Sequence, residues 1–425
     1  MMRIIRWLIC TAALAPVAAL QAQLDGNADE AKVAPYHLPD PLRAANGSPV
    51  RNARDWEARR RPELVRLFEE NVYGFAPPRP RHMRFAVTEQ TAGAFGGLAV
   101  RKQVTIYLAG SPRGPQLQML LYLPARATGR VPIFLGPNFH GNQAVTTDPA
   151  VAITPNWVVP TEGIAKNRAT IHSRGIDASQ WPIPRILAAG YGVATWFTGD
   201  VYPDGDGKFG DSIQPAIGTS PLDPSHWGAI ATWAWGLSRV CDYLATDPAV
   251  DARRVIVIGH SRYGKAALWA GARDTRFAAV IANDSGEGGA SLYRRNFGET
   301  IRVMNSYWFA PRWKTFAERE DELPVDAHEL IALIAPRPVY VAAATEDWWA
   351  DSRGQYLAAK AAEPVYRLLG AEGLAADTMP AADRPILSRI AFHLRTGAHD
   401  ITDWDWDNYI RWADRYVAGS KVAAP

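Results

Sequence analysis

The fold is decided by the stretch Val255-Ile256-Val257-Ile258-Gly259-His260-Ser261-Arg262-Tyr263-Gly264-Lys265-Ala266-Ala267. Its first residues are all β-branched, which is typical of a strand buried on both faces of a sheet. The small residue Gly259 and the helical pattern from Tyr263 onward predict a sharp strand-to-helix turn with Ser261 at its tip. Such a turn exposes the serine hydroxyl, and the backbone N–H groups of the following helix favour a developing negative charge. The simpler alternative is a serine that only caps a structural turn.

Strand and helix patterns alternate on both sides of this turn. We expect strands at residues 102–108, 117–123, 131–135, 192–197, 254–259, 278–283, 338–344 and 386–394. We expect helices at residues 56–71, 182–189, 227–244, 263–273, 328–334, 353–370 and 408–417. The alternation predicts an α/β fold with a doubly wound, mostly parallel sheet in a three-layer sandwich, and the two earliest strands could form an antiparallel edge. With the serine turn, it predicts the α/β-hydrolase fold.

The first 22 residues have the pattern of a secretory signal peptide. Two arginines precede a short apolar run that ends at Leu20, and Ala22 is a small residue suited to cleavage. The apolar run is too short to span a membrane comfortably, although a short membrane anchor is the alternative. We therefore expect a secreted or periplasmic protein without a membrane anchor after cleavage.

The remaining residues, 23–425, are expected to form a single domain with an N-terminal wrap that extends to about residue 95. A net charge of +3 is too balanced for a nucleic-acid-binding surface. Only Cys241 remains after signal cleavage, so no intrachain disulfide is expected. Clusters of Cys and His are absent from the sequence. We therefore expect no structural metal site of this type, and we also expect a monomer that needs no organic cofactor.

Loops and tryptophans give weaker indications of function. The long irregular segments 140–180 and 286–323 are expected to be functional, because long structureless loops in a compact domain usually are. The chain contains 16 tryptophans, several of them in loop-like segments. An indole face can stack on a sugar ring, but packing in the core explains these residues equally well.

A nucleophilic serine needs a base, and the base needs an orienting carboxylate. His399 follows the last expected strand, where α/β-hydrolases place their catalytic histidine. An ordinary loop histidine is the alternative. His393 lies inside that strand and is interpreted as a structural histidine. His260 is adjacent to Ser261 and is expected to point elsewhere.

Two aspartates compete for the role of acid. Asp347 follows strand 338–344, the usual position one strand before the histidine, and Asp284 ends strand 278–283. Both can reach a histidine above the sheet, and we expect Asp347 to be the principal acid with Asp284 as its partner or substitute. Glu346 and Asp351 are further candidates. The alternative roles are helix N-capping for Asp351 and turn stabilisation for Asp284.

Positive charge lies within one helical turn of Ser261. Lys265 is four residues further on and shares a helix face with it, although a solvent-facing lysine is the alternative. Arg262 provides the backbone N–H directly after the serine, and its guanidinium can stabilise acyl oxygens or a carboxylate product. Segment 139–142 ends another strand and could line the oxyanion hole.

At these residues the chain resembles the glucuronoyl esterases, carbohydrate esterases that cut the ester between glucuronic acid on xylan and lignin alcohols. The pattern G-x-S-R-x-G-K of this family is met at residues 259–265. Segment 284–289 looks like the family's segment after the next strand, where fungal members carry a catalytic glutamate and this chain has Asp284. Bacterial members are more similar, because they place an acid in the later loop, which matches Asp347.

The resemblance implies a role for each site residue. Ser261 would attack the ester carbonyl, and Arg262 would stabilise the tetrahedral oxyanion. Lys265 and Glu299 would hold the uronate hydroxyls. The sugar would be bordered by two tryptophans, Trp349 and, as a further candidate, Trp308. Without the resemblance, Glu299 and the tryptophans would be interpreted as salt-bridge and packing residues.

The implied reaction is a two-step acyl transfer through a glucuronoyl-enzyme, without metal or cofactor. The implied partners are glucuronoxylan and lignin–carbohydrate esters. One alternative is an acetyl-xylan or other carboxyl esterase on the same fold. A second alternative is a catalytically silent carbohydrate-binding protein.

Overall fold

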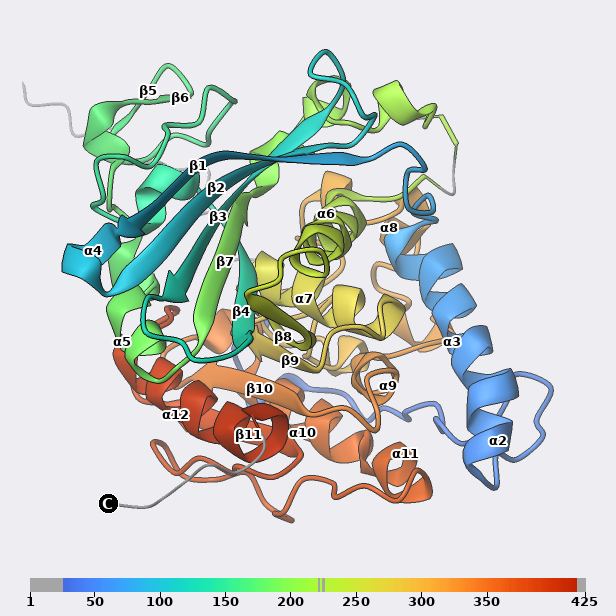
Figure 1. Ribbon diagram of the computed structural model, residues 1–425. Helices are drawn as coiled ribbons and strands as arrows, with labels where there is room; N and C mark the ends of the chain where they lie inside the picture. The colour runs from blue at the N-terminus through green and yellow to red at the C-terminus, as the bar shows by residue number, and fades with distance from the viewer. Residues whose placement is uncertain (1–25, 221, 224–225, 419–425) are drawn as a thin grey trace, which may run out of the picture.

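The computed structural model describes residues 26–220, 222–223 and 226–418, so the predicted signal peptide lies outside the described residues. In this part of the chain, a nine-stranded sheet has the order β1-β2-β3-β7-β4-β8-β9-β10-β11 (Figure 1). Its strands are β1 (Arg84–Gly93), β2 (Ala99–Tyr107), β3 (Gln116–Pro124), β4 (Val131–Asn138), β7 (Gly192–Phe197), β8 (Val250–His260), β9 (Ala279–Asn283), β10 (Val339–Ala344) and β11 (Ile390–Arg395). A separate two-stranded sheet consists of β5 (Ile164–Ala165) and β6 (Arg168–Ala169).

Most of the large sheet is parallel. Parallel pairing connects β7, β4, β8, β9, β10 and β11. Antiparallel pairing joins β1 to β2, β2 to β3 and β3 to β7. The predicted mostly parallel sheet and its antiparallel edge are therefore confirmed. The carboxyl ends of β7, β4, β8, β9, β10 and β11 meet at one edge of the sheet, where ligands bind in open α/β sheets.

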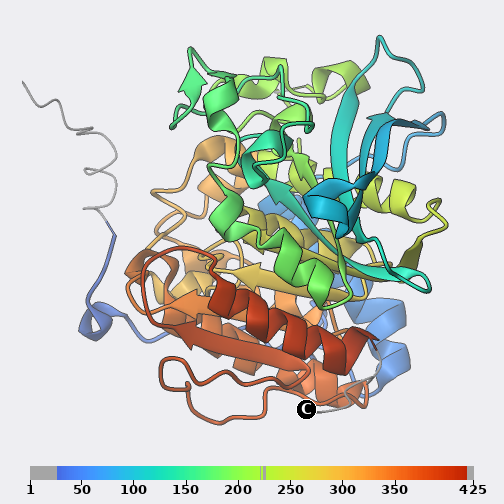
Figure 2. The ribbon, with the colours of Figure 1, turned by 60° about the vertical axis from the view of Figure 1, so that its left-hand side comes forward.

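Helices cover both faces of the sheet and confirm the predicted sandwich. Figure 2 shows α5 (Ile183–Ala188) and α12 (Asp403–Ala413) side by side on one face, where Arg185 pairs with Asp403 and Asp407. The opposite face is covered by α6 (Ala229–Leu244), α7 (Arg262–Arg273), α9 (Ala327–Ala332), α10 (Ser352–Ala361) and α11 (Glu363–Leu368). The remaining α-helices of the described residues are α2 (Ala53–Asp55), α3 (Arg61–Phe68), α4 (Ala94–Gly97) and α8 (Pro311–Lys314), and short 3₁₀- and π-helices occur between the elements.

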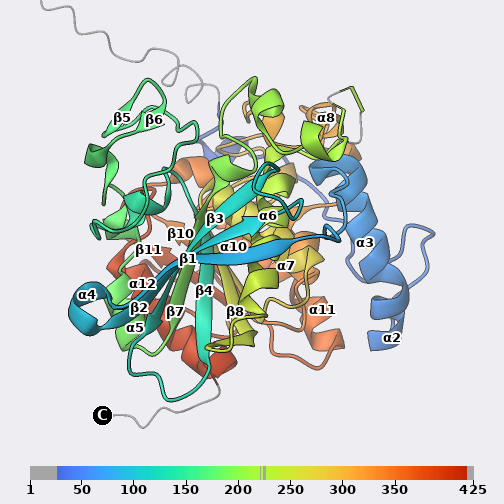
Figure 3. The same ribbon diagram turned by 45° about the horizontal axis from the view of Figure 1, so that its top comes forward.

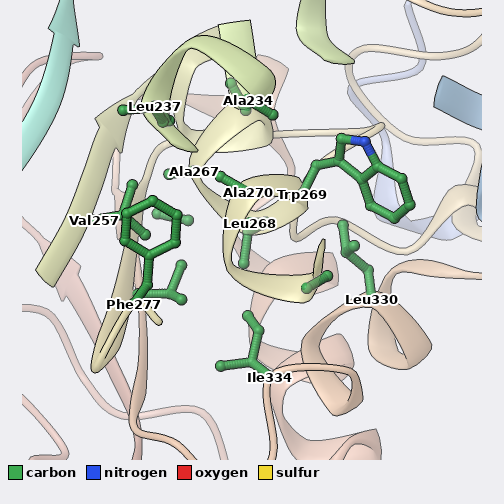
Figure 4. Close-up of a cluster of buried hydrophobic side chains, with 14 of the residues drawn as sticks. Ala234, Leu237, Val257, Ala267, Leu268, Trp269, Ala270, Phe277, Leu330 and Ile334 are labelled. Carbon is green, nitrogen blue, oxygen red and sulfur yellow. The ribbon is translucent and has the colours of Figure 1, made fainter. Parts of the chain in front are cut away.

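The helix that follows Ser261 lies at the centre of the larger core. Figure 4 shows Leu268 and Trp269 of α7 among buried side chains from α6, β8 and α9. On its outer side, α7 meets α3, where the rings of Phe68 and Trp269 are 6.2 Å apart (Figures 1 and 3). Burial of a leucine such as Leu268 contributes roughly 2 kcal/mol. This packing fixes α7, and with it the position of Ser261 at the carboxyl edge of the sheet.

Several observed elements differ from the predicted ranges, and the following differences are the most informative. β1 lies within the segment interpreted as an N-terminal wrap, and its polar sequence is explained by its place at the exposed edge of the sheet. The predicted helix 353–370 is two helices, because Pro364 is tolerated only in the first turn of a helix, here that of α11, which begins at Glu363. α12 begins earlier than predicted because Thr402 and Asp405 form a capping box. β11 begins at Ile390 rather than at residue 386.

No helix in the described part of the chain is long and apolar enough to cross a membrane.

Candidate active site

Ser261 lies at the predicted turn between β8 and α7. Its φ of 57° and ψ of −133° are unusual for a residue with a side chain. The turn is held by hydrogen bonds from Ser261 N to Asn283 O (2.9 Å) and from Gly264 N to Ser261 O (2.8 Å). A Cβ atom on Gly259 would lie 1.9 Å from the carbonyl oxygen of Tyr263, so this position requires glycine. The strained turn presents the serine at the edge where β9 and β10 also end.

His399 and Asp347 form a hydrogen-bonded pair on two neighbouring loops. His399 Nδ1 lies 2.6 Å from Asp347 Oδ2, and Asp347 Oδ1 accepts the backbone N–H of Ala350 at 3.2 Å. A proton on Nδ1 leaves Nε2 as the acceptor of a serine proton. Within the described residues, no hydrogen bond joins Ser261 to His399. Such bonds often tighten only when substrate is bound.

The other candidate acids of this loop have different surroundings. Glu346 is exposed and Asp351 is buried. Asp351 caps α10 by accepting the Gly354 N–H at 2.9 Å, and it also accepts from Arg295 Nε at 2.8 Å. Asp351 therefore has the capping role that was its alternative interpretation. Of these three acids, Asp347 is the one that contacts His399.

Asp284 is a second carboxyl group next to this pair. One ligand atom from each of Asp284, Asp347 and His399 lies within 4.8 Å of the others. Asp284 is buried, and both of its carboxyl oxygens lack a hydrogen-bond partner in the described part of the chain. Burial, and then the negative charge of Asp347, raise the pKa of Asp284 well above its ordinary value. These surroundings favour the neutral form of the Asp284 carboxyl group over the ionised form.

The same three side chains are a group that could hold a cation. The 2.6 Å contact between His399 Nδ1 and Asp347 Oδ2 leaves no room for an ion between these two atoms, because a metal keeps each ligand about 2 Å away. A metal ion at this place would have to replace the hydrogen bond. The geometry therefore fits an acid–histidine pair better than a metal centre.

His260 lies against His399, and the expectation that it points elsewhere is wrong. The centres of the two imidazole rings are 4.6 Å apart. His260 Nδ1 lies 2.5 Å from Asn283 Oδ1, and Asn283 Nδ2 donates to Tyr409 at 3.0 Å. Burial, and then the nearby His399, lower the pKa of His260 to about 3. His260 is therefore a neutral ring that supports one face of His399.

Arg262 is held in place by Asp204, a residue that the sequence did not single out. Arg262 Nε donates to Asp204, which also accepts from Tyr307 (2.8 Å) and from Trp308 Nε1 (3.2 Å). The guanidinium lies 4.7 Å from the centre of the Phe139 ring, at the end of β4. The only sequence signal for Asp204 is its position in the loop after β7. The proposed oxyanion role of segment 139–142 stays a prediction.

Lys265 and Glu299 form a buried ion pair beneath the turn. Lys265 Nζ donates to Glu299 Oε2 (2.6 Å), to Ser285 O (2.8 Å) and to Glu287 O (2.7 Å). A solvent-facing lysine is therefore excluded. A Cβ atom on Gly286, whose φ is +59°, would lie 2.7 Å from Glu299 Oε2. Glycine at this position allows the Glu299 carboxylate to approach the backbone.

The two candidate tryptophans lie next to these groups. Trp349 is half-buried, and its carbonyl oxygen accepts the backbone N–H of Glu299 at 2.7 Å. The Trp308 ring centre is 5.9 Å from the Arg262 guanidinium and 5.8 Å from Lys265 Nζ. Many other tryptophans have the alternative role in core packing, being fully buried: Trp56, Trp196, Trp227, Trp233, Trp269, Trp313, Trp406 and Trp412.

Arg395, at the end of β11, braces the loop that carries His399. Its guanidinium donates to the carbonyl oxygens of Thr396 (3.1 Å), Ala398 (2.6 Å) and Asp400 (3.1 Å). Its Nε lies 3.0 Å from Asp405 Oδ2 in the first turn of α12. No sequence pattern singled out this residue. Its position between the last strand and the histidine was the one available signal.

Comparison with known proteins places these residues in context. The family model of fungal glucuronyl esterases matches residues 223–370. A carbohydrate esterase from an unknown prokaryotic organism is 46% identical over 402 residues, and the match covers 92% of each chain. A solved glucuronoyl esterase from Solibacter usitatus is 43% identical with a TM-score of 0.86, and the match covers 90% of this chain and 99% of that chain. A 4-O-methyl-glucuronoyl methylesterase from Phanerochaete carnosa is 28% identical over 389 residues, which are 86% of this chain and 82% of its own length.

Proposed function

The chain belongs to the glucuronoyl esterase family, and on this basis we propose that it is a serine esterase that hydrolyses esters of (4-O-methyl-)glucuronic acid on xylan. The observation that carries the proposal is the strained Ser261 next to the bonded pair of His399 and Asp347. We further propose that the leaving groups are lignin alcohols and that the protein acts outside the cytoplasm as a monomer, in a single domain.

The proposed reaction has two acyl transfers. His399 Nε2 takes the Ser261 proton while the serine oxygen attacks the ester carbonyl, and the Arg262 side chain and backbone N–H stabilise the oxyanion. The imidazolium then protonates the leaving alcohol, which gives a glucuronoyl-serine ester. In the second step His399 takes a proton from water, and the resulting hydroxide attacks the acyl carbon. Serine is released with the returned proton, and Asp347 holds His399 in the required tautomer throughout.

The acid part of the ester would lie over Lys265 and Glu299. All three Lys265 donors have protein acceptors, so we propose that Lys265 fixes the Glu299 carboxylate and that this carboxylate accepts the sugar hydroxyls. A site built to accept hydroxyl hydrogen bonds discriminates strongly against substrates that lack them. Trp349 and Trp308 would border the sugar ring.

A substrate panel tests the function. Steady-state hydrolysis of benzyl and methyl glucuronate is compared with hydrolysis of the galacturonate esters and of acetylated xylan. We expect kcat/KM to be highest on the glucuronates, because the Glu299 carboxylate has a fixed position. A higher value on acetylated xylan would point instead to an acetyl-xylan esterase, and no turnover of any ester would point to a silent carbohydrate-binding protein.

Substitution of the nucleophile tests the mechanism. We expect Ser261→Ala to keep the fold and the binding of glucuronate but to lose turnover by about 10⁴-fold or more. The parent should form a covalent acyl adduct that mass spectrometry detects after rapid quenching, and the variant should not. Residual activity within about tenfold of the parent would contradict the assignment of Ser261.

Lys265→Ala tests the recognition of the sugar. Without Nζ, the Glu299 carboxylate loses its fixed position, so we expect kcat/KM on glucuronate esters to fall at least about a hundredfold. Phenyl acetate carries no sugar hydroxyls, and its hydrolysis should fall far less. Equal losses on both substrates would indicate that Lys265 only supports the fold of the turn.

A further inference from the structure

A cavity of about 370 Å³ lies at the carboxyl edge of the sheet, apart from the Ser261 site. It is bounded by Phe197, the last residue of β7, by Asn142, which follows β4, and by the beginning of the antiparallel strand β3. Its volume is within the range of small-ligand sites. The cavity therefore lies on the same edge as Ser261, towards the antiparallel side of the sheet.

The cavity wall offers neutral hydrogen-bonding groups between apolar surfaces. Amide or hydroxyl groups come from Thr88, Gln103, Gln116, Gln118, Asn142, Thr154 and Asn156. Within the described residues, Gln118 Nε2 and Asn156 Oδ1 have no protein hydrogen-bond partner, so one donor and one acceptor are available. The apolar part of the lining includes Met119, Ile153 and Phe197. This combination suits a ligand with both hydroxyl groups and an apolar face.

The side chains that line the cavity favour a neutral ligand over an acidic one. Its lining, as far as the structure describes it, includes no lysine, arginine or histidine, and Asp200 is its one acidic residue. The Asp200 carboxylate accepts hydrogen bonds from Gln118 N and Asn156 Nδ2, both at 2.7 Å. Burial raises the pKa of Asp200 to about 7, which weakens its attraction for cations near neutral pH. A neutral ligand rich in hydroxyl groups is the class that remains.

Two short segments connect the cavity to the Ser261 site. Asn142 accepts a hydrogen bond from Asn138 at 2.8 Å, and Phe139, the residue after Asn138, packs against the Arg262 guanidinium. On the other side, Asp200 of the cavity and Asp204, which holds Arg262, lie on one loop. The strand β4 alone separates β7 from β8. Neighbouring strands are about 4.8 Å apart, so the ends of β7 and β8 are separated by roughly 10 Å. The part of the lining that comes from β3, β2 and β1 lies farther from Ser261.

We propose that this cavity is a subsite for a neutral sugar residue of the glycan whose uronate ester reacts at Ser261, an inference that rests on the function proposed above. Gln118, Asn156 and Asp200 would pair with the sugar hydroxyls, and Met119 and Phe197 would contact the apolar face of the ring. The subsite would increase the affinity for a uronate ester that is attached to an oligosaccharide. It would not change the affinity for the ester of a single uronic acid.

A bulky substitution at the rim tests the subsite by kinetics. Ala152 is exposed and lines the cavity, and Ala150 is exposed but lies outside its lining, so Ala152→Trp is compared with Ala150→Trp. The substrates are methyl glucuronate and the same methyl ester carried on a neutral xylose oligomer. We expect Ala152→Trp to lower kcat/KM on the oligomer by about tenfold and on methyl glucuronate by less than about twofold. Ala150→Trp should behave as the parent on both.

Three results would contradict the proposed subsite. Ala152→Trp could leave kcat/KM on the oligomer unchanged, or it could lower kcat/KM equally on both substrates. Ala150→Trp could also lower kcat/KM on the oligomer as much as Ala152→Trp does. A selective loss on benzyl rather than methyl glucuronate would show that the cavity holds the alcohol. A failure of the proposed function would give a different result from a failure of the subsite. If the proposed function were wrong, the parent enzyme itself would not hydrolyse methyl glucuronate.

A binding measurement gives a second test that does not depend on turnover. The full chain with Ser261→Ala is titrated with a neutral xylose oligomer by calorimetry and by saturation-transfer NMR. We expect Asn156→Ala in this background to weaken binding about fivefold to tenfold, because it removes a hydrogen-bonding amide from the wall. Unaltered binding, with the fold intact by circular dichroism, would overturn the assignment.

Discussion

Residues with side chains adopt a left-handed φ at three points around the candidate site. The φ values are 57° for Ser261, 46° for Asp284 and 49° for Asp351. Each such conformation costs on the order of 1–3 kcal/mol and persists only where the surroundings enforce it. Here backbone hydrogen bonds do so, from Ser261 N to Asn283 O (2.9 Å) and from Asp284 N to Ala342 O (2.8 Å). The strain is thus concentrated where side chains must be presented at the edge of the sheet.

The pair of carboxyl groups next to His399 leads to a prediction about non-additivity. Loss of a sole triad acid can lower kcat by about 10⁴. Because the Asp284 carboxyl is within reach of His399, we expect Asp347→Asn to cost less than this. Asp284→Asn should cost less still, since an amide resembles a neutral acid. The double variant should lose much more than the product of the two single effects, as expected of groups that act as a unit.

The measurement is kcat on benzyl glucuronate for the parent, both single variants and the double variant. Asp351→Asn is not a suitable control, because Asp351 caps α10, whereas the exposed Glu346 permits Glu346→Gln as a matched control on the same loop. A full loss from Asp284→Asn, with Asp347→Asn near normal, would make Asp284 the triad acid.

At the scale of single residues, the sequence identified Ser261 and His399 as the candidate nucleophile and base but did not decide which aspartate is the principal acid. Motif and chain order point to the serine and the histidine, because both follow strands of the same sheet. Two neighbouring strands, β9 and β10, are followed by an aspartate, and only the three-dimensional contacts separate Asp347 from Asp284. Asp204 could not be found because it is 58 residues away from Arg262 along the chain.

At the scale of elements, the sequence predicted strands with buried apolar runs better than edges and ends. β8 and α7 were predicted because apolar strand and helix patterns meet at a glycine. β1 was missed because an edge strand has solvent on one side and tolerates a polar sequence. The start of α12 depended on a side-chain cap, which the apolar pattern does not report.

The connection from β11 to α12 carries His399, and its order depends on Arg395. We expect Arg395→Gln to lower kcat on benzyl glucuronate by about 10–100-fold with little change in KM, because the loop would hold His399 less accurately. Arg395→Lys should rescue little, since an ammonium group cannot reach three carbonyl oxygens and Asp405 in the fork geometry of a guanidinium.

The matched control is Arg389→Gln, which removes an exposed arginine–carbonyl bond (3.2 Å to Pro336 O) just before the other end of β11. Thermal unfolding distinguishes a positioning role of Arg395 from a role in stability alone. If Arg395 only stabilised the fold, Arg395→Gln would lower Tm without changing the kcat of the folded enzyme. The imidazole N–H resonance of His399 should also broaden in Arg395→Gln. A variant with normal kcat and a normal resonance would contradict the positioning role.

At the scale of the whole molecule, the N-terminal segment that begins at Gly26 reaches the sugar-binding side of the candidate site, next to Glu299 and Trp349. Gly298 N donates to Asn27 O at 2.8 Å, one residue before Glu299. A Cβ atom on Gly26 would lie 2.8 Å from the Trp349 ring, so the segment also packs directly on this tryptophan. These contacts join residues that are far apart in the sequence, which explains why the pattern of this segment predicted a wrap but not its place beside Glu299.

Glu30 anchors this segment and gives a prediction with a defined pH dependence. Its carboxylate pairs with Arg295 (2.7 Å) and Arg353 (3.1 Å), and the hydrogen bond from Arg295 holds the pKa of Glu30 below its ordinary value. A lowered folded-state pKa means that Glu30 stabilises the protein above the pKa of an unfolded glutamate, about 4.3, and that this contribution is lost as the pH falls through the folded value. We therefore expect Glu30→Gln to lower Tm by a small amount at neutral pH, and the difference from the parent to vanish at acidic pH.

The same substitution should affect activity through Glu299 and Trp349 rather than through Ser261. We expect Glu30→Gln to raise KM for glucuronate esters about threefold, with kcat and the hydrolysis of phenyl acetate nearly unchanged, because loosening the segment disturbs the sugar-binding side and leaves the nucleophile in place. Asp29→Asn is the matched control, since an asparagine oxygen can still accept the Ala31 N–H that Asp29 accepts at 3.0 Å, and the lost 3.7 Å contact with Lys32 is exposed and away from the site. If Asp29→Asn raised KM equally, or if Glu30→Gln lowered kcat on phenyl acetate, the N-terminal segment would not act through the sugar-binding side.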